Sequence, residues 1–173
     1  WWIMTHRIGN YPKDDFVEFL LTPNGFSTPI VQHIGPMIQT VSIGVFGQGK
    51  FSPDGNKFLV DDGPGVVALF DFDRCTGQLS NYIDLDVIHP FNITNVITGC
   101  SFSPNSQIAY YSEKDTLYSV QVNDPTVVYK FAWQTGAMWW HELGPDGKIY
   151  IHSDNPPIYS NYYVINDPNV FGS

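Results

Sequence analysis

"CSFSPNSQIAYYS" fills residues 100–112, and two other stretches repeat its plan. "KFSPDGNKFLVDD" begins at Lys50, and "ELGPDGKIYIHSD" begins at Glu142. In each stretch a Pro followed by Asp or Asn comes before a run in which apolar residues recur. Pro presets φ for a turn, Asp or Asn forms local hydrogen bonds, and Gly tolerates positive φ. The stretch therefore predicts a tight turn between two strands, and we interpret it as turn chemistry, not as a catalytic motif.

The composition indicates a folded β-protein. The chain has 173 residues, of which 43% are hydrophobic and 16% aromatic, too many for a disordered chain. Only 14% are charged, against roughly 25% in an ordinary soluble domain. Strand-like alternation of apolar residues runs along the whole sequence, and no helical period accompanies it. We therefore predict an all-β fold.

The spacing of the repeated turns indicates which β architecture this is. Pro53, Pro104 and Pro145 mark corresponding turns at intervals of roughly 40–50 residues, which is the length of a four-stranded propeller blade. We predict a partial β-propeller of about three and a half four-stranded antiparallel blades. The expected units are half a blade at 1–36, followed by blades at 37–88, 89–133 and 134–173.

The predicted propeller is incomplete. Propellers close with about 4–8 blades, and an open array leaves apolar faces and sheet edges uncovered. The chain also opens on Trp1 and Trp2, which are typical of the middle of a strand. A free end frays and would expose these large apolar side chains to water. We expect the chain to belong to a longer protein, with the ring completed by the remainder of its own propeller or by another protein chain.

The net charge narrows the classes of partner. Acidic residues number 17 and Lys plus Arg number 8, which gives a formal net charge of -9. Such a surface repels phosphate backbones, so we expect no nucleic-acid partner. No apolar run approaches the roughly 18 residues that a membrane-spanning helix requires, so we expect no membrane span.

Several phrases resemble a family of β-propeller proteins that Bacteroidota export through the type IX secretion system. The resemblance covers most of the chain, in the family's order, and implies the second half or so of such a propeller. It implies a secreted or cell-surface location and no established reaction. The phrases are "FLLTPNGFSTPIVQ" (19–32), "KFSPDGNKF" (50–58), "LFDFDRCTGQLSN" (69–81), "FSPNSQIAYYS" (102–112), "LGPDGKIYI" (143–151) and "VINDPN" (164–169).

The densest aromatic group falls where propellers commonly meet ligands, in the connections between blades and their neighbouring loops. It consists of Trp133, Trp139, Trp140 and His141. Flat aromatic rings that carry one hydrogen-bonding group can stack on sugars or bury a partner's side chain. Packing between blades is the competing interpretation, above all for Trp139 and Trp140.

Neither catalytic nor metal-binding motifs stand out in the sequence. The histidines, at positions 6, 33, 89, 141 and 152, show no HxH, HxxxH or HExxH spacing, although three of them recur loosely at the blade period. Asp61, Asp62 and Asp154 end strands and could offer oxygen ligands to Ca²⁺, but stabilisation of turns explains them as well. We expect no cofactor, with Ca²⁺ as the alternative.

Two cysteines and two modification signals complete the candidates. Cys75 is expected in a turn and Cys100 on an inner strand of the next blade, toward opposite faces, which disfavours a disulfide. "DTL" at 115–117 resembles the Asp-Thr-apolar pattern of bacterial O-glycosylation and marks Thr116. "NIT" at 92–94 is an N-glycosylation sequon that matters only in a host with that machinery.

These patterns favour a non-catalytic protein, secreted or at the cell surface, that binds a glycan or another protein. One alternative is a lactonase-like or lyase-like propeller enzyme with a metal on its central axis, for which propeller analogy is the only support. A second alternative is a structural subunit of an assembly, which would present a large apolar interface to another chain.

Overall fold

A computed structural model describes residues 1–6, 13–38, 47–62, 66–85, 97–113, 115–132, 137–155 and 158–172. The fifteen secondary-structure elements within these ranges are all β-strands, and every strand pairing among them is antiparallel. In the described part of the chain no helix is long and apolar enough to cross a membrane. The all-β prediction is confirmed.

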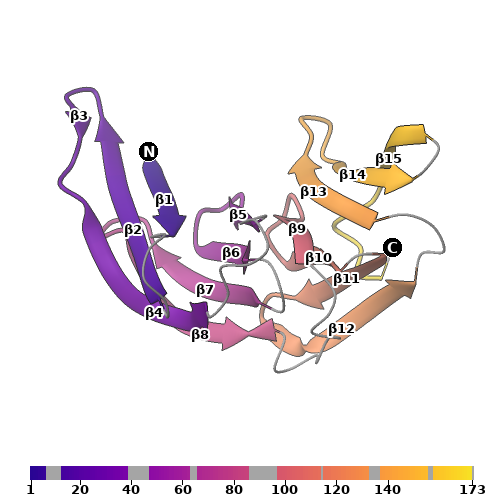
Figure 1. The fold of residues 1–173 in the computed structure, drawn as a ribbon, viewed down its shortest axis with the longest axis horizontal. Coiled ribbons are helices and arrows are strands. Elements are labelled where there is room, and N and C mark those ends of the chain that lie inside the picture. The colour runs from indigo at the N-terminus through magenta and orange to yellow at the C-terminus, as the bar shows by residue number, and fades with distance from the viewer. Residues whose placement is uncertain are drawn as a thin grey trace.

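The strands form four sheets that follow one another along the chain, from the indigo N-terminal sheet to the yellow C-terminal one (Figure 1). Sheet 1 contains β1 (Trp2–His6), β2 (Lys13–Thr22), β3 (Gly25–Phe26) and β4 (Ile30–Ile38). Sheet 2 contains β5 (Gly47–Phe51), β6 (Lys57–Asp62), β7 (Val67–Asp73) and β8 (Gln78–Asp84). Sheet 3 contains β9 (Ile97–Phe102), β10 (Ile108–Glu113), β11 (Thr116–Gln121) and β12 (Asp124–Ala132). Sheet 4 contains β13 (Ala137–Leu143), β14 (Ile149–Asn155) and β15 (Ile158–Ile165).

Sheets 2 and 3 are complete four-stranded meanders, in which each strand pairs with its neighbour in sequence. In sheet 1, β2 pairs with β1 and β4, and the short β3 pairs with the end of β2. Half a blade was expected at 1–36, and the division into units stays a prediction. The boundary expected after residue 36 falls inside β4. The boundaries expected after residues 88 and 133 lie outside the described residues.

The repeated Pro phrase forms the turn between the first two strands of a blade. In sheet 2 the Ser52 N–H donates to the Lys57 carbonyl oxygen at 2.9 Å, and the Asp54 carboxylate accepts from the Asn56 N–H at 3.1 Å. Gly55 has φ +71°, a left-handed conformation that glycine adopts without strain. The same backbone bond closes the turn of sheet 3, where the Ser103 N–H donates to the Ile108 carbonyl oxygen. The turn thus fixes the register of each blade's inner strand.

Three apolar clusters lie between neighbouring sheets and hold them face to face. Because side chains alternate between the faces of a strand, each inner sheet contributes one set of residues to each neighbour. Each large apolar side chain that is buried stabilises the fold by about 1.5–3 kcal/mol. The buried members include Phe16, Phe58 and Phe70 between sheets 1 and 2, Leu59, Cys100 and Tyr111 between sheets 2 and 3, and Tyr110, Met138 and Ile151 between sheets 3 and 4.

Candidate functional site

The predicted aromatic group does not form one surface. Trp133 lies outside the described residues. On β13, Trp140 is 57% exposed and Trp139 is partly buried, whereas His141 is completely buried. Consecutive side chains point to opposite faces of a strand, and the pairing of β13 with β14 is irregular between Met138 and His141. The structure therefore sends Trp140 and His141 to different environments.

Trp140 belongs instead to a row of rings that crosses sheet 4. Its ring centroid lies 6.3 Å from that of His152 on β14, which lies 5.8 Å from that of Tyr162 on β15. Tyr162 is 66% exposed, and its strand neighbour Val164 is 38% exposed. We call the face formed by Trp140, Tyr150, His152, Tyr162 and Val164 the open flank.

Corresponding faces of the preceding sheets are covered. Tyr150 and His152 lie on β14, the second strand of sheet 4. The residues at the same register positions are Leu59 and Asp61 on β6 of sheet 2, and Tyr110 and Ser112 on β10 of sheet 3. All four of these residues are 0% exposed, because the next sheet packs on them. His152 itself is only partly buried, and its Nδ1 atom has no hydrogen-bond partner among the described residues. The open flank therefore has the composition of a blade face that a further sheet would cover.

A second cluster of polar side chains joins the inner strands β5, β9 and β13. The Gln48 side chain accepts hydrogen bonds from the Cys100 and His141 N–H groups, both at 3.0 Å, and donates to the His141 carbonyl oxygen at 2.7 Å. Lys50 on β5 also reaches Glu142 on β13, with 2.6 Å between Nζ and Oε2. We call this set of contacts the Gln48 clamp. It joins three sheets to one another where their inner strands β5, β9 and β13 lie side by side (Figure 1).

His141 is a neutral, structural residue in this cluster. Its Nε2 atom lies 3.0 Å from Ser112 Oγ, whose hydroxyl donates to the Met138 carbonyl oxygen at 3.3 Å. Since the hydroxyl has one proton, His141 Nε2–H donates to it, and Nδ1 is left without a partner among the described residues. Burial, with a smaller contribution from Lys50, lowers the pKa of His141 from 6.5 to about 3. A completely buried imidazole of this kind is not placed to bind a partner directly.

The candidate metal ligands are only partly covered by the structure. Asp61 is completely buried, and its Oδ1 accepts from the Gln48 N–H at 3.2 Å. The side chains of Asp62 and Asp154 lie outside the described residues. Within the described ranges no three His, Cys, Asp or Glu side chains come together as a metal site requires. The Ca²⁺ site stays a prediction.

The remaining candidates lie apart from one another. Thr116 is partly buried at the start of β11, and its hydroxyl donates to Asp115 at 3.3 Å; its glycosylation stays a prediction. Cys75 is exposed in the turn between β7 and β8, Cys100 is buried on β9, and neither forms a disulfide. His33, on β4, pairs with Asp15 at 2.6 Å. His89 and the sequon at 92–94 lie outside the described residues.

Sequence reasoning missed Gln48 and Ser112, which make the buried polar contacts around His141. A signal for Gln48 exists in the sequence, because it stands between Gly47 and Gly49 on an inner strand, where small neighbours leave room for a long side chain to cross to other strands. Ser112 carried no comparable signal, since a serine within an apolar strand has many explanations.

Comparison with known proteins establishes the fold. No protein-family model and no curated protein matches the chain. Among solved structures, it resembles a luciferin-regenerating enzyme, with a TM-score of 0.60 and 16% identity over 96% of this chain and 55% of that one. It also resembles the β-propeller domain of Cps50 (Swd1) from Myceliophteria thermophila, with a TM-score of 0.54 and 12% identity over 88% of this chain and 50% of that one. The chain spans about half the length of these structures, and the prediction of an all-β, partial β-propeller is confirmed.

Proposed function

We propose that the protein is a non-catalytic β-propeller module that binds another protein through the open flank of sheet 4. The observation that carries this proposal is the contrast between Tyr162 and Val164, which are exposed, and the covered faces of sheets 2 and 3. Clusters of exposed aromatic side chains are typical of protein interfaces, whose energetic centres are rich in Trp and Tyr.

The chemistry of the flank indicates what the partner presents. Sheets 2 and 3 show that this kind of face accepts an apolar β-sheet face, packed side chain against side chain. The partner we propose is therefore a β-sheet with an apolar face, of the kind that a further propeller blade offers.

The polar groups of the inner strands support a non-catalytic role. Gln48 and Ser112 are engaged with neighbouring backbone or with His141, and the imidazole of His141 is neutral and buried. These groups join blades to each other. We place the module outside the cell or at its surface on the strength of the sequence resemblance alone, and fractionation of the source cells tests that location.

Site-specific photocrosslinking tests the proposed function. A photoreactive amino acid at position 162 should yield one crosslinked protein, with the crosslink mapped by mass spectrometry to an apolar β-strand. The same amino acid at position 170, which is 57% exposed on the segment after β15, is the matched control. Tyr162→Glu should weaken binding of the identified partner by about tenfold or more.

Two results would overturn this proposal. The first is a crosslink yield at position 162 no higher than at position 170. The second is turnover of a lactone by the protein together with a stoichiometric metal ion, which would establish the enzymatic alternative.

A further inference from the structure

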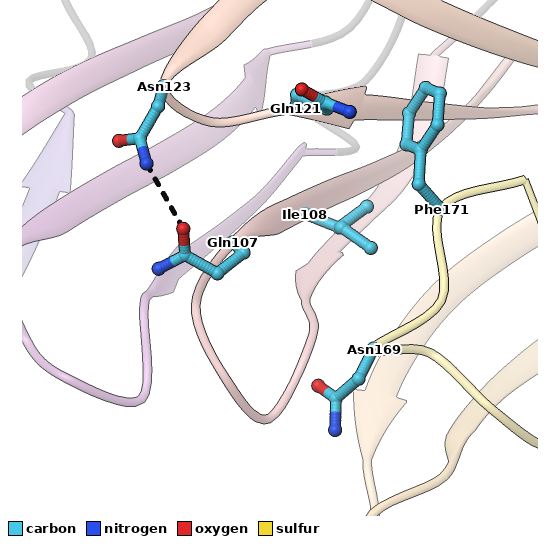
Figure 2. A pocket seen from close by; sticks show the side chains of 6 residues that line it. All are labelled: Gln107, Ile108, Gln121, Asn123, Asn169 and Phe171. Atoms are coloured by element: carbon cyan, nitrogen blue, oxygen red, sulfur yellow. Dashed lines mark hydrogen bonds between the residues drawn. The ribbon is translucent and has the colours of Figure 1, made fainter.

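A pocket of about 280 Å³ lies between sheet 3 and the segment that follows β15. Figure 2 shows Gln107 and Asn123 on one side of it and Phe171 and Asn169 on the other. Gln121 and Ile108, a directly opposed pair on β11 and β10, lie between them. These six residues form its lining, and none of them belongs to the open flank.

The pocket is preformed, because hydrogen bonds tie its two sides together. The Tyr110 hydroxyl donates to the Pro168 carbonyl oxygen at 3.0 Å, and the Asn105 N–H donates to Asn169 Oδ1 at 3.0 Å. Phe171 packs against the apolar cluster between sheets 3 and 4, to which Ile108 belongs. A ligand would therefore meet a site whose shape needs little ordering, which favours binding.

Among the described residues that line the pocket, the polar ones are all amides: Gln107, Gln121, Asn123 and Asn169. Asn123 Nδ2 donates to Gln107 Oε1 at 3.1 Å, which uses one donor and one acceptor. Within the part of the chain that the structure describes, the Gln121 amide, the Asn169 NH₂ group and the Asn123 carbonyl oxygen make no hydrogen bond. The pocket thus offers donors and acceptors side by side, and none of the described residues that line it is charged.

The apolar part of the lining is flat on one side. The Phe171 ring and the side chain of Ile108, which is 3% exposed, give the pocket an aromatic and aliphatic surface. A ligand that fits has one C–H face for this surface and a rim of groups that both donate and accept hydrogen bonds. The described lining residues include neither a cation that would bind a phosphate or carboxylate nor a carboxylate that would bind an amine.

We propose that this pocket binds a neutral sugar, with the C–H face of one pyranose ring against Phe171 and its hydroxyls on Gln121 and Asn169. A pyranose hydroxyl donates and accepts, as each of these amides does. The volume lies just below that of sites for drug-sized ligands, roughly 300–1,000 Å³, and so suits a single ring. This site is independent of the protein-binding flank proposed above.

Nuclear magnetic resonance with defined probes tests the proposal on the full chain. Methyl glucoside, methyl mannoside, methyl galactoside and N-acetylglucosamine are titrated singly, with glucuronate, glucosamine and a blocked dipeptide as comparison ligands. At least one neutral sugar should receive saturation transfer at its ring C–H protons and shift the side-chain amide signals of Gln121 and Asn169. The charged sugars and the dipeptide should bind more weakly.

Variants connect the binding to the pocket. Gln121→Ala should weaken binding of the sugar about three- to tenfold, as expected for one or two lost hydrogen bonds. Asn169→Asp keeps the Oδ1 acceptor for the Asn105 N–H and replaces the NH₂ donors with a carboxylate oxygen, so it should fold normally and also bind the sugar more weakly. Gln78→Ala, an exposed amide on β8, is the matched control and should leave the affinity unchanged.

The proposal is overturned if no neutral sugar shifts the two amide signals. It is also overturned if a charged sugar or the dipeptide binds best, or if both pocket variants bind the sugar as the unchanged protein does.

Discussion

Gly99, on β9, lies directly against the backbone of β13. A Cβ atom added there would collide with the Trp139 carbonyl oxygen and would lie 2.8 Å from Cδ2 of His141. Because the first obstacle is backbone, it cannot move aside as a side chain can. We expect Gly99→Ala to lower the free energy of unfolding by about 3 kcal/mol or more, measured by chemical denaturation.

Gly49→Ala provides the comparison, because the new Cβ there would meet the Phe58 ring at 2.9 Å, and a ring edge can shift. It should cost clearly less than Gly99→Ala. Equal losses from the two substitutions would contradict the close approach of β9 and β13.

His141 makes the stability of the protein depend on pH. The folded protein keeps His141 neutral down to about pH 3, whereas the unfolded chain binds its proton near pH 6.5. The unfolded state thus gains a proton between these values, so the free energy of unfolding falls as the pH drops from about 6.5 toward 3. His141→Gln should remove up to about 1.4 kcal/mol per pH unit of that slope.

Denaturation curves recorded across this pH window check the prediction. Met138→Leu, a buried change of packing on the same strand, introduces no titrating group and should keep the full slope. If His141→Gln and Met138→Leu show the same dependence on pH, the buried neutral imidazole is not its source.

At the scale of the elements, the stability of the inner strands β5, β9 and β13 depends on the Gln48 clamp. Gln48→Ala would leave the Cys100 N–H and both backbone groups of His141 without their partner. Buried polar groups that lose a partner cost about 1–3 kcal/mol each, less where water can enter. We expect a loss of about 2–4 kcal/mol, and faster hydrogen exchange at the Cys100 and His141 amides.

Gln78→Ala is the control for this substitution, since it removes an exposed glutamine from β8 and should change neither stability nor exchange by much. Unchanged exchange at Cys100 and His141 in Gln48→Ala would show that the clamp does not hold the inner strands.

The elements also show how far the sequence could predict this structure. The turns at Pro53, Pro104 and Pro145 and the strands after them follow from local rules, because turn chemistry and alternation act over a few residues. The candidate site depends on which face each residue takes. Alternation along β13 sends Trp140 and His141 to opposite faces, but the irregularity between Met138 and His141 decides which of them is buried, and no local pattern indicates that. The amide pocket joins residues 107–123 to residues 169–171, which only the packing of sheets brings together.

At the scale of the whole molecule, the four sheets differ in how they are covered. Sheets 2 and 3 have neighbours on both faces, whereas sheet 4 presents the open flank and sheet 1 exposes Ile3 and Val31 on its far side. Protection from hydrogen exchange follows burial and local stability. We expect amides of β6, β7, β10 and β11 to exchange most slowly, and those of β1 and β15 most rapidly.

Hydrogen exchange followed by mass spectrometry measures this order directly. Binding of the proposed partner should slow exchange in β15 and leave the centre of sheet 2 unchanged. Uniform protection across the four sheets, without a partner, would contradict the idea that the end sheets lack a cover.

The contacts of Gln48 with two other sheets affect how the number of sheets can change in evolution. Repeat proteins gain and lose units readily when each unit touches only the adjacent ones. Here a side chain of the second sheet bonds to the backbone of the fourth, past the third. Removing or duplicating sheet 3 would therefore break the contacts that Gln48 makes with both sheet 3 and sheet 4. We expect evolution to change the number of sheets in such a protein one at a time only with difficulty.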